Sequence, residues 1–66
     1  MSELDAALGR LDPADRTLLE EKYFNGREVR TIAEKLALSP KAVESRLTRA
    51  RDALRRELLP ALRRHE

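Results

Sequence analysis

The sequence predicts a small all-α domain of four helices. Apolar residues recur at spacings of three and four in four segments, which is the period of an amphipathic helix. Three of those segments follow a residue that can cap a helix, namely Ser2, Asp12 or Ser39. No segment alternates apolar and polar residues as a strand does. With 66 residues, the chain is expected to form one domain, 1–66, with a thin core.

The first helix is expected to begin at Ser2, with Asp5 as the second member of a capping box. Leu4, Leu8 and Leu11 then share one helical face, because they stand at i, i+4 and i+7. That face is predicted to pack into the core.

The second helix is predicted to start with Asp12 as its cap and Pro13 in its first position. Its apolar face is expected to contain Leu18, Leu19, Tyr23 and Phe24. The Asn-Gly pair at 25–26 should end the helix, because glycine readily takes the left-handed conformation of a helix C-terminus.

The third helix is predicted over about residues 28–37. Its apolar stripe consists of Val29, Ile32, Ala33 and Leu36, at i, i+3, i+4 and i+7. The three residues 37–39 then form a turn that leads directly into the next helical segment.

The fourth helix is the longest that the pattern predicts. Ser39 can cap it, and Pro40 suits its first position. Its inward stripe is expected to contain Val43, Leu47, Ala50 and Leu54. The pattern continues as far as Pro60, which should end or kink the helix because proline has no amide proton to donate.

The third and fourth helices have the pattern of a helix-turn-helix over about residues 28–56. Such a unit packs two apolar helix faces together, and its second helix projects a polar face into the major groove of DNA. Ala33 is small enough for close helix approach, and Leu38 is expected to fill the corner between the helices. The expected fold is therefore a small all-α, four-helix domain with a helix-turn-helix and a long C-terminal recognition helix.

The charge distribution fits a nucleic-acid partner. Residues 1–38 hold six basic and eight acidic residues, whereas residues 39–66 hold eight basic and four acidic ones. The basic excess therefore lies on the predicted recognition helix and beyond it, as expected for contact with a polyanion such as DNA. A solvated helix face rich in Arg is the alternative interpretation.

Outward residues of the helix-turn-helix are the candidates for DNA recognition, because the N-terminal part of a recognition helix contacts base edges. The candidates for base readout are Lys41, Glu44, Ser45, Thr48 and Arg49. The candidates for phosphate contact are Arg30, Thr31, Arg46 and Arg51. Arg and Lys match guanine, and Glu can accept a hydrogen bond from cytosine. Away from a cytosine or a neighbouring Arg, however, Glu44 would repel phosphate.

Several strings within residues 11–58 resemble region 4 of bacterial sigma-70 family factors, especially the extracytoplasmic-function group. They include Leu-Asp-Pro-Ala-Asp-Arg at 11–16, Tyr-Phe-Asn-Gly at 23–26 and Ile-Ala-Glu-Lys-Leu at 32–36. The most specific is Val-Glu-Ser-Arg-Leu-Thr-Arg-Ala-Arg at 43–51. The resemblance implies a cytoplasmic DNA-binding domain that reads the −35 promoter element in transcription initiation. It also implies docking on the β-subunit flap of RNA polymerase and control by an anti-sigma factor.

The chain departs from the family pattern in three ways. Ala37 replaces the usual turn glycine, so the turn should take a right-handed or bridge conformation or accept mild strain. Glu44 stands where many members have a basic or polar residue, so the family's base preference cannot be transferred. Region 2, which melts promoter DNA, is missing. We therefore expect an excised domain of a longer factor, with a stand-alone relative as the alternative.

Three other functions remain open from the sequence. The string at 38–44 also resembles the turn of LuxR-type response-regulator domains. The run that leads from Ser45, Arg46 and Leu47 into Arg49, Ala50 and Arg51 fits that family less well. A second alternative is a helical module that docks on polymerase or an anti-sigma factor without binding DNA. A third is an amphipathic helix that binds a membrane surface, but acidic residues interrupt its basic face. The sequence leaves the oligomeric state open.

The composition gives no support to catalysis, metal binding or membrane insertion. The chain has no cysteine, which fits a reducing cytoplasm, and His65 is its one histidine, whereas a structural zinc site takes about four ligands. No apolar run approaches the roughly 20 residues of a membrane span. No nucleophile–base pair or glycine-rich phosphate loop is visible. We therefore expect no catalytic residue, no cofactor, no metal and no membrane partner.

Overall fold

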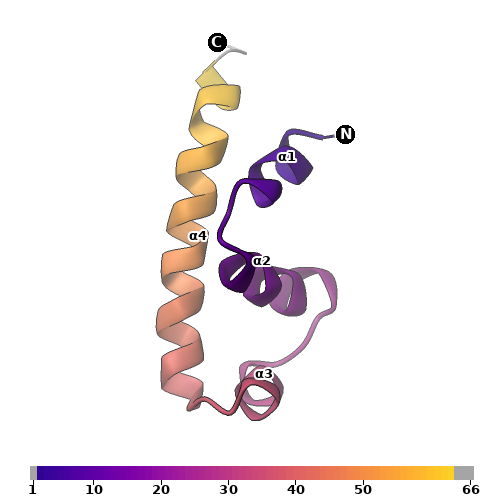
Figure 1. The fold of residues 1–66 in the computed structure, drawn as a ribbon, viewed down its shortest axis with the longest axis vertical. Helices are drawn as coiled ribbons and strands as arrows, with labels where there is room; N and C mark the ends of the chain where they lie inside the picture. The colour runs from indigo at the N-terminus through magenta and orange to yellow at the C-terminus, as the bar shows by residue number, and fades with distance from the viewer. Residues whose placement is uncertain (1, 64–66) are drawn as a thin grey trace.

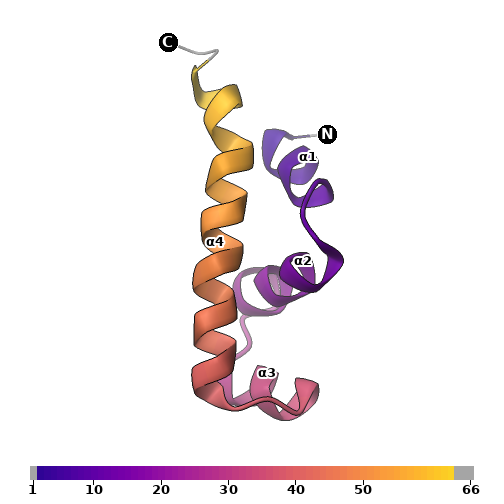
Figure 2. The ribbon, with the colours of Figure 1, turned by 60° about the vertical axis from the view of Figure 1, so that its left-hand side comes forward.

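The computed structural model describes the backbone of residues 2–63 and the side chains of residues 2–60. The elements follow in the order α1 (Glu3–Gly9), α2 (Pro13–Leu19), the π-helical turn η1 (Glu20–Phe24), α3 (Val29–Leu36) and α4 (Pro40–Arg63). Helix α4 runs the length of the molecule, and the three shorter α-helices are arranged along one side of it (Figures 1 and 2). The described residues contain no strand. The predicted all-α fold is thus confirmed.

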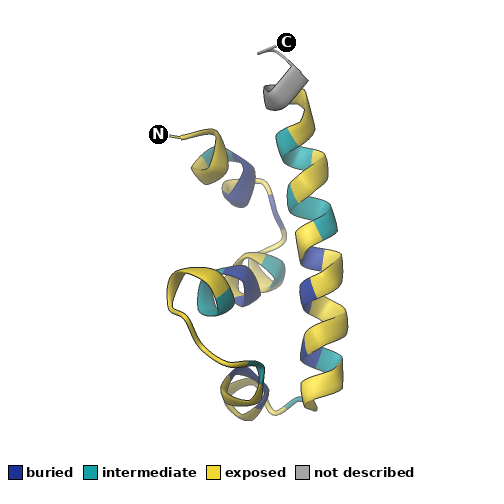
Figure 3. Ribbon diagram, turned by 180° about the vertical axis from the view of Figure 1, so that it is seen from behind, coloured by how far each residue is buried: buried dark blue, intermediate teal, exposed yellow. Residues whose placement is uncertain are grey.

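The core lies between α4 and the shorter helices. Ile32 and Val43 are completely buried, and the buried positions of α4 face the short helices (Figure 3). The core cluster comprises Leu8, Leu11, Leu18, Leu19, Ile32, Ala33, Val43, Leu47 and Ala50. Every short helix or its adjoining loop therefore buries apolar surface against α4, which is the main favourable contribution to folding.

The predicted capping box at the start of α1 is confirmed. The backbone N–H of Asp5 donates to Ser2 Oγ over 3.1 Å, and the Ser2 N–H donates to the Asp5 carboxylate over 3.4 Å. The predicted apolar face is only partly correct, because Leu4 is 38% exposed. Helix α1 ends at Gly9, so Leu11 reaches the core from the following connection and not from the helix itself.

A salt bridge fastens the end of α1 to α4. Arg10 Nε lies 2.7 Å from Glu57 Oε2, and Arg10 Nη2 also donates to the Glu57 carbonyl over 3.4 Å.

Helix α2 begins as predicted, with Asp12 before it and Pro13 in its first turn. The Asp12 side chain, however, makes no capping hydrogen bond. The start of α2 thus relies on proline's fixed φ angle and on its position against α4.

The π-helical turn η1 corrects the predicted apolar face of the second helix. The Asn25 N–H donates to the Glu20 carbonyl over 2.9 Å, an i to i+5 hydrogen bond that widens the turn. Because the turn is wider, Tyr23 and Phe24 rotate off the line of buried Leu18 and Leu19. They are 50% and 58% exposed. Gly26 then ends the segment at a positive φ of 65°, as predicted.

The turn of the helix-turn-helix uses a left-handed residue. Ala37 has φ 57° and ψ 43°, so the expected right-handed or bridge conformation is wrong and the alternative of mild strain is correct. This conformation directs the Leu38 N–H to the Ala33 carbonyl over 2.9 Å, which closes the end of α3. Leu38 packs against the core as expected, whereas Leu36 is 40% exposed and does not complete the predicted inward stripe.

Helix α4 starts as predicted and continues past Pro60. Ser39 Oγ accepts a 3.1 Å hydrogen bond from the Ala42 N–H, and Pro40 opens the helix. Pro60 lies inside α4, which continues to Arg63, so of the two predicted effects, an end or a kink, the end is wrong. A proline removes one hydrogen bond within a helix, but here the remaining backbone hydrogen bonds carry the helix past it.

Candidate nucleic-acid interface

The buried seam of the helix-turn-helix fixes which face of α4 is free. Ile32 and Ala33 of α3 share the core cluster with Val43 and Leu47 of α4, as the sequence predicted. Successive helical residues are separated by about 100°, so the residues between these buried ones must lie on the flanks or on the opposite face. The orientation of the first three turns of α4 therefore follows from the core.

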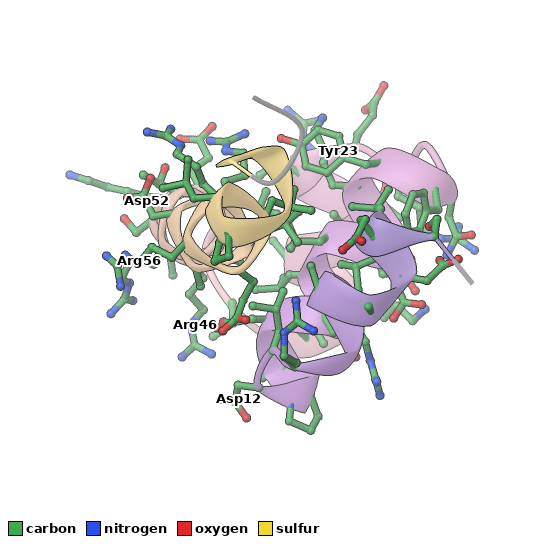
Figure 4. All side chains as sticks on the ribbon, turned by 90° about the horizontal axis from the view of Figure 1, so that it is seen from above. Asp12, Tyr23, Arg46, Asp52 and Arg56 are labelled. Carbon is green, nitrogen blue, oxygen red and sulfur yellow. The ribbon has the colours of Figure 1, made fainter. Side chains whose placement is uncertain are left out.

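The five predicted base-readout residues lie together on the exposed surface of α4. All of them fall in the N-terminal part of the helix, within residues 41–49: Lys41, Glu44, Ser45, Thr48 and Arg49. Further along the helix, Asp52 and Arg56 point away from the shorter helices (Figure 4). The exposed face thus continues along α4 without a covering element from the described part of the chain.

Thr48 is engaged within its own helix. Its hydroxyl donates to the Glu44 carbonyl over 3.0 Å and accepts from Arg51 Nη2 over 3.4 Å. The hydroxyl proton is therefore occupied, which leaves the methyl group as the outward feature of Thr48. A methyl group can contact the C5-methyl of thymine in the major groove.

One flank of α4 faces η1 and the start of α3. Arg51 Nη1 donates a hydrogen bond to the hydroxyl of Tyr23, which comes from η1. Beside this pair lies an open hollow of about 370 Å³, whose lining includes Lys22, Glu44 and Arg51. The sequence pattern did not predict that Lys22 and Tyr23 lie beside this face. Their proximity to Arg51 depends on the π-helical turn, which the apolar pattern does not reveal.

The other flank of α4 faces the start of α2. Arg46 points toward the side of the molecule on which Asp12 lies, opposite to Tyr23 (Figure 4). Arg46 and Arg49 line a hollow of about 340 Å³ together with Asp12 and Asp15. This flank therefore combines two arginines that would attract a phosphate with two carboxylates that would repel it. The sequence did not predict this arrangement.

The start of α3 supplies the last two predicted phosphate contacts. Arg30 and Thr31 are both exposed, in the first turn of the helix directly after Val29. The first turn of a helix carries backbone N–H groups without intrahelical partners, which favour a nearby anion. The structure thus places the predicted phosphate candidates in three places, namely the α3 start and the two flanks of α4.

An apolar groove lies between α2 and the end of α3; none of the base-readout residues lines it, but the phosphate candidate Arg46 does. Its volume is about 390 Å³. The lining residues are Pro13, Ala14, Thr17, Leu18, Leu36, Leu38 and Arg46. The exposure of Leu36, which contradicted the predicted inward stripe, is explained by its place in this wall. Exposed apolar surface with a polar rim is typical of sites for protein partners.

A cluster of charges holds the first helix of the helix-turn-helix in place. Glu21 accepts a 2.8 Å hydrogen bond from Lys35 Nζ and lies 2.8 Å from Arg27 Nε. The hydrogen bond and charge of Lys35, together with Arg27, hold the pKa of Glu21 below its ordinary value of 4.5, although partial burial opposes this shift. The cluster links η1 to α3 and the loop between them.

The described residues offer neither a metal site nor a membrane span. No group of three or more His, Cys, Asp or Glu side chains there is arranged to hold a metal ion. His65, the one histidine, lies outside the described residues. None of the described helices has the length and apolar character needed to cross a membrane.

Comparison with known proteins identifies the family. A family model described as "Sigma-70, region 4" matches residues 1–54, from before α1 to the middle of α4. No curated protein matches the chain. The family match covers α3, the turn after it and the string at 43–51, and it does not favour the LuxR-type alternative. The chain therefore belongs to the sigma-70 region 4 family, whose helix-turn-helix domains bind promoter DNA as part of sigma factors that direct RNA polymerase in transcription initiation.

Proposed function

We propose that this domain reads the −35 promoter element for an extracytoplasmic-function-type sigma factor in the cytoplasm. The observation that carries the proposal is that the N-terminal part of α4 is exposed on one face. Its opposite face is buried, because Val43 and Leu47 pack in the core with Ile32 of α3. A rigid helix with an exposed polar face fits the major groove, which is about 12 Å wide. The sigma-70 region 4 match supports promoter recognition by this face.

The chemistry of the exposed residues suggests their roles in readout. Arg49 and Lys41 are suited to guanine O6 and N7, and Glu44 to the amino group of cytosine. Ser45 can exchange hydrogen bonds with several bases, whereas Thr48 offers its methyl group because its hydroxyl is bound to the Glu44 carbonyl. The preferred promoter sequence should therefore contain both G·C pairs and a thymine.

Phosphate contacts on either side of this face would set the depth and angle of α4 in the groove. Arg46 and Arg51 project from opposite flanks of α4, and Arg30 and Thr31 lie at the start of α3. Such contacts carry most of the salt-dependent affinity and little sequence information. We expect the isolated domain to bind DNA weakly and with strong salt dependence, because a small reader makes few contacts.

The apolar groove between α2 and α3 is the proposed docking site for the β-subunit flap of RNA polymerase. Its wall exposes Leu36 beside Pro13 and the partly buried Leu38, and no base-readout residue lines it. Docking there would tether the domain to polymerase and raise its effective concentration at the promoter. An anti-sigma factor that covered this groove or the start of α4 would block one of these contacts.

Selection from a random duplex library tests the DNA-binding proposal. The wild-type chain should enrich a defined sequence motif, and Arg49→Ala should lose the preference at one position. The expected penalty is about 1–3 kcal/mol if Arg49 makes a bidentate guanine contact. Equal loss on selected and scrambled DNA would reassign Arg49 to a phosphate contact. If the chain binds the library at low salt but no motif is enriched, promoter readout by this domain is refuted.

Titration with a flap segment tests the docking proposal separately. Leu36→Gln should weaken flap binding and leave DNA binding unchanged, because Leu36 lines the groove and the substitution adds no charge beside Arg46. Leu59→Gln is the matched control, since Leu59 is similarly exposed at 38% but lies near the far end of α4. Flap binding without DNA binding would support a docking module. Tight dimeric binding to a palindrome without flap binding would contradict the sigma-factor assignment.

A further inference from the structure

Tyr23 occupies an unusual position for an aromatic residue in so small a domain. Half of its surface is exposed, because the π-helical turn η1 rotates it off the core face of α2. Its hydroxyl accepts a hydrogen bond from Arg51 Nη1, 28 residues further along the chain. The aromatic ring thus contributes little to the core, and its polar end meets a cation of the DNA-facing helix.

Arg51 is held at two points and remains free at others. One terminal nitrogen donates to Tyr23 and the other donates to Thr48 Oγ1 over 3.4 Å. A guanidinium has five N–H donors in a fixed planar fork, so three donors are still available for an anion. The side chain itself is exposed and borders the hollow that Lys22 and Glu44 also line.

Fixing an arginine in advance changes how well it binds phosphate. A free arginine on a helix surface samples many rotamers, and binding must stop that motion at an entropic cost. Thr48 alone offers one acceptor on the same helix, whereas Tyr23 offers a second acceptor from a different element. Two acceptors from separate elements define the plane of the guanidinium, which a single acceptor does not.

We infer that Tyr23 is a positioning residue for DNA binding: its hydroxyl orients Arg51 toward a backbone phosphate beside the recognition helix. The inference rests on the proposed function, since it needs α4 to meet DNA. An alternative role in stability is weak, because hydrogen bonds and ion pairs between exposed groups contribute little to folding. The pair therefore acts mainly on the direction in which Arg51 points.

Tyr23→Phe tests this role, because it removes the hydroxyl and keeps the ring. DNA affinity should fall about three- to tenfold on both selected and scrambled duplexes, since a phosphate contact carries no sequence information. The slope of log affinity against log salt should become shallower by up to about one unit. The melting temperature should stay close to wild type, because Tyr23 is half exposed.

A double-mutant cycle with Arg51→Ala identifies the route of the effect. In the Arg51→Ala background, Tyr23→Phe should cause no further loss, because the side chain that it positions is gone. Two variants serve as matched controls. Phe24→Leu alters the neighbouring exposed aromatic residue, and Arg16→Ala removes an exposed cation from α2. Both should bind DNA as the wild type does.

Three results would overturn the inference. Unchanged affinity of Tyr23→Phe, with Arg51→Ala weakened, would mean that Arg51 needs no positioning. An undiminished effect in the Arg51→Ala background would mean that Tyr23 contacts DNA directly. Tighter binding by Tyr23→Phe would mean that Tyr23 competes with DNA for Arg51. If the wild-type chain shows no salt-dependent DNA binding at all, the proposed function fails first, and the two failures are thereby distinguished.

Discussion

Lys35 Nζ donates a 2.8 Å hydrogen bond to Glu21 Oε1, and this contact ties α3 to the π-helical turn η1. The Glu21 side chain is only 12% exposed, so water screens the contact less than it screens a fully exposed pair. Arg27 approaches the other carboxylate oxygen over 2.8 Å. The first helix of the helix-turn-helix is thus held by charge on one side and by Ile32 on the other.

The Glu21 cluster should make stability depend on acidic pH. The pKa of Glu21 is lower in the folded chain than its ordinary value of 4.5. The ionised carboxylate therefore stabilises the fold fully at pH values above 4.5, and this stabilisation is lost as the pH falls through the lowered pKa. Glu21→Gln should therefore be less stable than wild type at pH 7, and the difference should shrink below pH 4.5. Urea unfolding across pH measures it. Glu34→Gln, which removes an exposed carboxylate from α3, is the control. If the difference in free energy of unfolding between Glu21→Gln and wild type stays unchanged at acidic pH, the ionised form of Glu21 does not have this role.

The seam between α3 and α4 should dominate stability. Ile32→Ala and Leu47→Ala should each cost about 2–5 kcal/mol, because both side chains are buried. A domain of this size has a free energy of unfolding of about 3–10 kcal/mol, so either substitution can unfold it. Leu36→Ala on the same α3 is the control and should cost less, since Leu36 is 40% exposed. A thermal melt in which Leu47→Ala matches Leu36→Ala would mean that the assigned inward face of α4 is wrong.

Ala37→Gly should stabilise the domain. Ala37 has φ 57°, a left-handed conformation that costs an L-residue about 1–2 kcal/mol and costs glycine almost nothing. Glycine also makes the unfolded chain more flexible, which lowers the stability by about 0.4–1 kcal/mol, so the free energy of unfolding should rise by about 0.5–1 kcal/mol. Differential scanning calorimetry should show a melting temperature a few degrees higher. Ala53→Gly within α4 should instead destabilise by about 1 kcal/mol, and a similar loss for Ala37→Gly would argue against the left-handed turn.

Glu44 should limit non-specific DNA binding. Glu44→Lys should raise the affinity for scrambled DNA, because it replaces a charge that repels phosphate with one that attracts it. The salt slope should steepen by about one unit if a new phosphate contact forms. Titrations at several salt concentrations provide the measurement. An unchanged slope with unchanged affinity would mean that Glu44 does not face DNA.

The sequence was sufficient for the helices that the core requires. From the helical spacing of apolar residues and the capping residues, we predicted the helix starts at Ser2 and Ser39, the burial of Ile32 and Leu47, and the end at Gly26. Each of these features depends on residues that are close in the chain. The all-α fold followed from these local patterns.

The features that sequence reasoning missed depend on contacts between distant segments. Tyr23 has an apolar ring at a helical spacing, but a single widened turn moved it to the surface beside Arg51. Leu36 fits the apolar stripe of α3, yet it lines a groove that exists only once α2 is in place. Local patterns do not contain this information.

Amide chemical-shift mapping with duplex DNA tests whether the exposed face of α4 recognises DNA. We predict that a DNA titration of the isotope-labelled chain at low salt shifts signals of the α3 start, near Arg30 and Thr31, and of residues 41–51 in α4, and that added salt reverses these shifts. Such mapping detects weak binding, and at low salt a duplex of arbitrary sequence is sufficient, because the phosphate contacts do not depend on the bases. Shifts confined to α1 and the groove beside Leu36, or no shifts at low salt, would contradict DNA recognition by the exposed face of α4.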